Sequence, residues 1–149
     1  MDKSHDIDVL NTLIATTLDS VKGFREAADD SKVANHAQFF REMAEERGRV
    51  ASDLQAHVRM HGGDPRTESS TAGALHRTWL NIREAITGGD EDAIIREVEN
   101  GEDYIKGKFE AALRDEDLSP DCRAMLEQCM TSIRKGHDRA SAMKHALAD

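Results

Sequence analysis

An arginine, Arg47, interrupts the apolar face of a predicted helix that runs from Val33 to His61. Phe40 precedes it by seven residues and Leu54 follows it by seven, so all three side chains point the same way on a helix. A cation that is buried alone costs too much free energy, and it therefore needs an acidic partner or a route to water. The chemistry indicated at this position is an ion pair or a polar centre inside the protein.

Glu102 interrupts the apolar stripe of a later predicted helix in the same way. Arg47 lies about 15 residues into its helix and Glu102 about 12 residues into its own, so the two meet within one turn if those helices run side by side. We therefore predict a buried Arg47–Glu102 pair. It is either a structural ion pair that fixes the register of the helices or the remnant of a polar active centre.

Two further polar residues, Arg25 and His137, lie near the apolar faces of their helices and complete a predicted buried polar seam with Arg47 and Glu102. For Arg25 we expect the aliphatic stem to pack while the charged head reaches solvent or an acid.

Internal glycines accompany these positions. Four of them lie inside predicted long helices: Gly23, Gly48, Gly101 and Gly136. Each lies within two residues of one of the seam residues and costs about 1 kcal/mol relative to alanine. They indicate either close helix packing or room for a bulky polar side chain from a neighbouring helix.

Two histidines have metal-ligand spacing. His57 and His61 are four residues apart on one helical face, with Asp64 close by, and two imidazoles of this kind can hold Zn²⁺ or Ni²⁺. The alternative is an exposed helix end without a function. No nucleophile elbow, phosphate-binding loop or dinucleotide fingerprint occurs, so we predict no catalytic residues.

The elements that must position these residues are helices. The chain has 149 residues with 38% apolar and 33% charged residues and only two prolines, and it lacks long runs of strand-forming residues. These features predict a single all-α domain over residues 1–149.

The net charge of −9 argues against nucleic-acid binding, and no apolar run is long enough to span a membrane. Cys122 and Cys129, seven apart on one predicted helix, are too far apart for a disulfide. We expect a cytoplasmic protein.

Apolar periodicity predicts long helices at about 6–29, 32–61, 91–114 and 120–147, and a short helix at about 72–87. Residues 29–31 supply a turn and an N-cap for the second helix, Asp90 caps the fourth, and Ser119 with Pro120 starts the last. The short turns make two antiparallel hairpins, joined by a long crossover that contains the short helix. That layout predicts a ferritin-like four-helix bundle. A simple up-down bundle with the fifth helix packed outside is the alternative.

Four segments of the chain carry a resemblance to a known family. They are AGALHRTWLNIREAITGGDEDAIIREVENGEDYIKGKFEAAL, GFREAADD, EERGRVASDLQ and HDRASAM. With these segments the chain resembles a family of small bacterial ferritin-like four-helix-bundle proteins of unknown function. The resemblance covers residues 7–145 and implies the ferritin-like fold. A ferritin-like di-metal centre uses inward carboxylates and two Glu-x-x-His motifs. This sequence has no Glu-x-x-His motif, and Arg47 would repel a dication. We therefore expect no complete di-iron site and no cofactor.

The leading interpretation is a non-enzymatic binding or assembly module, linked to the stress response through its resemblance to ferritin-like relatives. The first alternative is a metal-binding or redox protein with a degenerate centre that holds iron, manganese or zinc. A second alternative is a structural bundle that works by forming a homo-oligomer. No nucleic-acid or membrane partner is expected.

Overall fold

The computed structural model describes residues 4–69 and 74–148, and it describes the side chains of 4–69 and 76–143. The described residues form five helices and no strand, so the predicted all-α class is confirmed. The helices are α1 (Ser4–Asp30), α2 (Ala34–Met60), α3 (Ala74–Gly88), α4 (Glu91–Leu113) and α5 (Pro120–Ala148). The predicted first residues of the short helix, 72 and 73, lie outside the described residues. No helix within the described ranges is long and apolar enough to cross a membrane.

Side-chain caps explain where two of the helices begin, and a third helix starts without one. Asp90 Oδ1 accepts a hydrogen bond from the Ala93 N–H at 3.1 Å and caps α4, as predicted. Ser119 Oγ accepts from the Cys122 N–H at 3.2 Å, and α5 begins at Pro120. The cap predicted for α2 within residues 29–31 is wrong. The N-cap is Val33, which has an extended backbone and a side chain that cannot accept a hydrogen bond.

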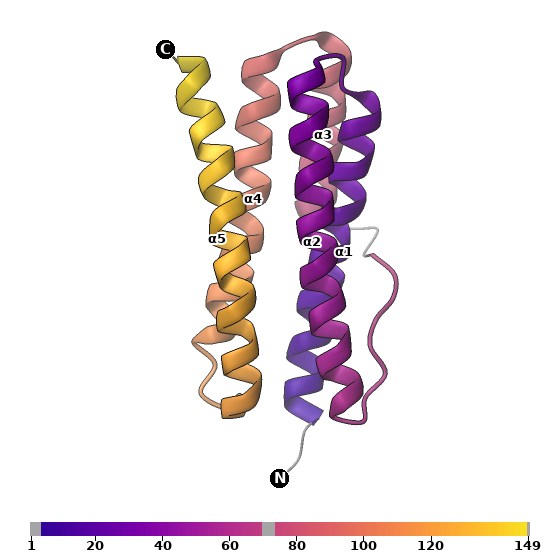
Figure 1. The fold of residues 1–149 in the computed structure, drawn as a ribbon, viewed down its shortest axis with the longest axis vertical. Helices are drawn as coiled ribbons and strands as arrows, with labels where there is room; N and C mark the ends of the chain where they lie inside the picture. The colour runs from indigo at the N-terminus through magenta and orange to yellow at the C-terminus, as the bar shows by residue number, and fades with distance from the viewer. Residues whose placement is uncertain (1–3, 70–73, 149) are drawn as a thin grey trace.

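The long helices lie side by side, and their directions follow from Figure 1. The chain runs up α1 and down α2, and residues 61–69 then return along the outside of the molecule toward α3. α4 begins at the same end as α2 and runs down, and α5 returns upward. The closest backbone contacts join α1 to α2 and α4 to α5, α3 packs on α4 and α1, and fewer contacts join α2 to α5 and α1 to α4.

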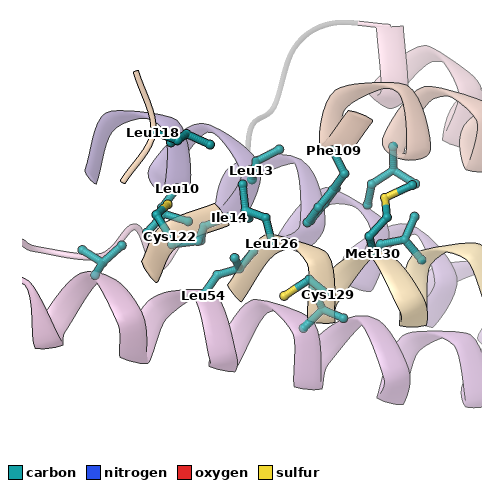
Figure 2. Packing of buried hydrophobic residues seen from close by; sticks show 14 residues of the cluster. Leu10, Leu13, Ile14, Leu54, Phe109, Leu118, Cys122, Leu126, Cys129 and Met130 are labelled. Carbon is teal, nitrogen blue, oxygen red and sulfur yellow. The ribbon is translucent and has the colours of Figure 1, made fainter. Parts of the chain in front are cut away.

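The core consists of two apolar clusters, one toward each end of the long helices. The first cluster contains residues from α1, α2, α4, α5 and the α4–α5 connection. Figure 2 labels ten of its members: Leu10, Leu13, Ile14, Leu54, Phe109, Leu118, Cys122, Leu126, Cys129 and Met130. The second cluster adds α3 and is rich in aromatic residues. Its members include Phe24, Phe39, Phe40, Trp79, Ile82 and Ile86.

Candidate functional site

A polar layer separates the two apolar clusters. Along α1 the first cluster ends at Ile14 and the second begins at Phe24. Buried polar or glycine residues lie between the two clusters on each of the four long helices. They are Thr17, Ser20 and Gly23 on α1, Arg47 on α2, Gly101 and Glu102 on α4, and Gly136 on α5. This layer is the candidate functional site because it contains the only two charged residues, among those described, that are at most 1% exposed.

Arg47 and Glu102 form a bidentate ion pair in this layer. Arg47 Nη1 donates to Glu102 Oε2 at 2.7 Å, and Arg47 Nη2 donates to Glu102 Oε1 at 2.6 Å. The two residues are 0% and 1% exposed. Such parallel charge-assisted hydrogen bonds are the strongest that side chains make, and both carboxylate oxygens are engaged.

Arg47 and Glu102 meet because each lies at a similar distance from the start of its helix. α2 and α4 begin at the same end of the molecule, and both charged residues lie roughly three to four turns from the start of their helices. However, α2 and α4 are not among the helix pairs whose backbones are in contact at several positions. The expectation that these helices run side by side therefore needs correction. The long Arg47 side chain reaches Glu102 across the middle of the core.

Gly136 of α5 makes room for the ion pair. A Cβ atom at this position would overlap the Arg47 guanidinium and lie 2.9 Å from Glu102 Oε1 and 2.8 Å from Met43 Cε. On the other side, the Arg47 guanidinium carbon lies 5.9 Å from the centre of the Phe24 ring, within range of a cation–π interaction. Arg47 Nε is buried and has no hydrogen-bond partner among the described atoms.

The other internal glycines do different things. Gly23 of α1 faces the indole ring of Trp79, and a Cβ at this position would overlap that ring. The space at Gly23 is therefore filled by an apolar side chain of α3 and not by a polar group. A Cβ atom at Gly48 would meet no described atom within 4 Å, so no neighbouring side chain requires a glycine at this position.

Glu46, next to Arg47 in the sequence, faces the edge of the α2–α5 contact. Its carboxylate accepts hydrogen bonds from Arg49 at 2.7 Å and from the Ser132 hydroxyl at 2.6 Å. These bonds, that from Arg49 first, lower the pKa of the Glu46 carboxyl. Glu46 is partly exposed and engaged by these partners, and Glu102 is the one glutamate among the described residues that is buried as a whole.

Arg25 and His137 do not belong to the buried layer, contrary to the prediction. Arg25 is exposed on α1. The side chain of His137 is 20% exposed, and its Nε2 lies 2.5 Å from Asp103 Oδ1 at the surface of the α4–α5 contact. Each follows a buried residue by one position, which turns it about 100° away from the core.

His57 and His61 lie together at the end of α2. Their Nε2 atoms are 2.9 Å apart, and both side chains are partly buried. Asp64 does not complete a group of three ligand atoms with them in the described part of the chain. The two imidazoles alone would hold a metal ion weakly.

Neither Cys122 nor Cys129 forms a disulfide, and both are buried. Burial raises the pKa of Cys129 to about 12, and the negative charge of Asp53 adds to this effect. A thiol of this kind stays protonated at neutral pH, and it is therefore a poor nucleophile and a poor metal ligand.

Sequence reasoning missed one cluster of chemically active side chains. His5, Asp115 and Asp117 lie together at one end of the molecule. His5 and Asp115 are 110 residues apart in the sequence, so no local spacing could have indicated their contact.

Comparison with protein-family models matches residues 5–115 to a family described as a domain of unknown function, DUF2383. The matched segment includes both members of the ion pair and extends from the first turn of α1 to just beyond α4. A search of curated proteins finds no match.

Proposed function

Since the chain belongs to the DUF2383 family, whose description assigns no activity, we propose from the geometry that the protein is a ferritin-like bundle without a di-metal centre. In this proposal it acts as a binding or assembly module and not as an enzyme. The observation that carries the proposal is the bidentate Arg47–Glu102 pair at the centre of the long helices.

The helix directions support the ferritin-like assignment. α2 and α4 begin at the same end of the molecule, and the connection between them runs back along its length (Figure 1). Bundles with one long crossover of this kind include the ferritin-like folds, which build their metal sites from inward-facing side chains at the bundle centre.

The residues at this centre do not fit a di-metal site. Such a site needs several carboxylates and histidines, and among the described residues Glu102 is the one buried carboxylate of the polar layer. Both of its oxygens accept hydrogen bonds from Arg47. A dication placed here would have to displace the guanidinium and would be repelled by its charge.

A buried ion pair of this kind is suited to defining structure. The pair stabilises one register of α2 relative to α4, because a shift of one helical turn would leave both charges without a partner in the core. A bundle with a closed centre and a net charge of −9 then acts through its surface. Binding to a partner or to a second copy, in the stress response that its ferritin-like character suggests, is the role we propose.

Metal analysis tests the proposal directly. We expect the full chain, purified without an affinity tag, to contain no iron or manganese bound at the centre. The Glu102→Ala variant identifies any central metal, because a metal ligated by Glu102 would be lost from it. Iron or manganese at one or two ions per chain, lost from Glu102→Ala and retained in His5→Ala, would overturn the proposal.

Light scattering over a concentration series tests the assembly role. A dimer or larger homo-oligomer supports assembly with a second copy. A monomer at all concentrations would exclude self-association and leave binding to a different partner as the proposed role.

A further inference from the structure

The first turn of α1 and the α4–α5 connection bring three metal-ligating side chains together at one end of the molecule. One ligand atom from each of His5, Asp115 and Asp117 lies within 4.8 Å of the other two. His5 Nε2 is 2.7 Å from Asp115 Oδ2. We propose that these three residues form a binding site for a divalent transition-metal ion such as Zn²⁺, separate from the buried ion pair.

The donor set decides the class of ion. One imidazole nitrogen and two carboxylate oxygens form a mixed nitrogen and oxygen site, which suits Zn²⁺ and neighbouring first-row ions. The imidazole favours these ions over Mg²⁺ and Ca²⁺, which prefer oxygen ligands alone. Three protein ligands leave further coordination positions for water, and the cluster is open enough to admit it, because the His5 side chain is 47% exposed.

The backbone around the cluster is held by contacts that do not depend on an ion. The Arg123 guanidinium donates to the carbonyl oxygens of Leu113 and Asp115, which fixes the chain where α4 ends. Asp6 Oδ1 accepts a hydrogen bond from the Ser119 N–H at 3.1 Å and joins the first turn of α1 to the start of α5. The two segments that carry the three ligands are therefore already positioned relative to each other.

The side chains themselves are also oriented. Asp115 Oδ1 accepts from the Asp117 N–H at 2.9 Å, which leaves Oδ2 directed at His5. An ion that enters between them replaces the His5–Asp115 contact and needs only small side-chain movements, because the ligand atoms are already within 4.8 Å of one another.

The local charge favours a cation. Asp115, Asp117 and Asp6 surround His5, and their negative charge, led by the hydrogen bond to Asp115, raises its pKa. The same field attracts a metal ion. The positive charge of Arg123 also acts on Asp115 and contributes to lowering its pKa. The Arg123 Nη1 and Nη2 atoms donate to backbone carbonyl oxygens and not to the carboxylates of the cluster.

Calorimetric titration of the tag-free full-length protein with ZnCl₂ tests the site. We expect one Zn²⁺ per chain, and at least about a tenfold loss of affinity in His5→Ala and in Asp117→Asn. His76→Ala is the matched control, because His76 is an exposed histidine on α3 far from the cluster, and it should bind as the wild type does. Circular dichroism melts of each variant without metal confirm that the fold is intact.

The variant His57→Ala/His61→Ala separates this site from the histidine pair of α2. Binding that survives in this double variant and is lost in His5→Ala supports the proposal. Binding that is lost in the double variant and unchanged in His5→Ala would overturn it. Absence of Zn²⁺ binding with Kd below about 1 mM in the wild type would overturn it as well. None of these results bears on the polar layer, so the proposed function is tested independently.

Discussion

Arg47 and Glu102 are 55 residues apart in the sequence and are joined by two hydrogen bonds in the centre of the protein. The side chain of Arg47 is 0% exposed to solvent and that of Glu102 is 2% exposed. They lie between two apolar clusters, so the largest fully buried side chain of the described core is a cation. Stability should therefore depend on each charge keeping its partner.

Replacement of Arg47 by alanine should destabilise the protein by about 3–5 kcal/mol, because it leaves the Glu102 carboxylate buried and unpaired. Urea denaturation followed by circular dichroism measures the change. The double variant Arg47→Met/Glu102→Leu is the control, since it removes both charges and should cost far less than the single change. An unchanged urea midpoint in Arg47→Ala would contradict the buried pair.

Substitution of Gly136 and Gly48 by alanine should change stability in opposite directions. At Gly136 the new methyl group would overlap the Arg47 guanidinium, so we expect destabilisation by about 1–3 kcal/mol. At Gly48 nothing lies within 4 Å, so the better helix propensity of alanine should stabilise by about 0.5–1 kcal/mol. Thermal melts of the two variants provide the comparison. Equal effects at both positions would show that Gly136 does not make room for the pair.

The His5–Asp115 contact should make stability depend on pH. The pKa of His5 is raised by its hydrogen bond to Asp115, and that of Asp115 is lowered, chiefly by the Asp117 N–H and then by His5. The stabilisation from His5 is thus present at low pH and is lost as pH rises through its folded-state pKa. The contribution of Asp115 is lost as pH falls through its own lowered pKa. The contact is therefore strongest between these two pKa values.

This dependence can be measured by comparing melting temperatures of the wild type and His5→Gln over a pH series in metal-free buffer. The difference between the two proteins should decrease as pH rises above about 6.5, the ordinary histidine value. A difference that stays constant up to pH 9 would show that the imidazolium does not pair with Asp115.

The two cysteines should react slowly with thiol reagents in the folded protein. Both are buried, and burial raises the pKa of Cys129 to about 12, so its thiolate is scarce at pH 8. Both thiols should react quickly in denaturant. Absorbance assays with an aromatic disulfide reagent report the two rates, and fast labelling of either cysteine in native buffer would contradict their burial.

Local features were predictable from the sequence because they depend on residues a few positions apart. The all-α class follows from helical periodicity, and the caps at Asp90 and Ser119 each involve an N–H three residues away. The cap of α2 was not predictable in this way. Acidic and hydroxyl residues precede the helix, yet it begins after Val33, which has no capping side chain.

The polar layer was partly predictable. Charged residues in apolar stripes identified Arg47 and Glu102, because burial of an unpaired charge is so costly that each implies a partner. The same reasoning grouped Arg25 and His137 with them, although one position on a helix is enough to turn a side chain to the surface. Sequence spacing could not resolve that difference.

By itself the sequence determined the helices, their order and the presence of two charges that need partners. Only the tertiary structure decided how those charges are held: Gly136 leaves space beside the pair, and the Arg47 side chain crosses the core to reach Glu102. It also decided that His5 lies against Asp115, 110 residues away. The physical reason is that side-chain contacts between distant segments depend on helix packing and depth, which local periodicity does not specify.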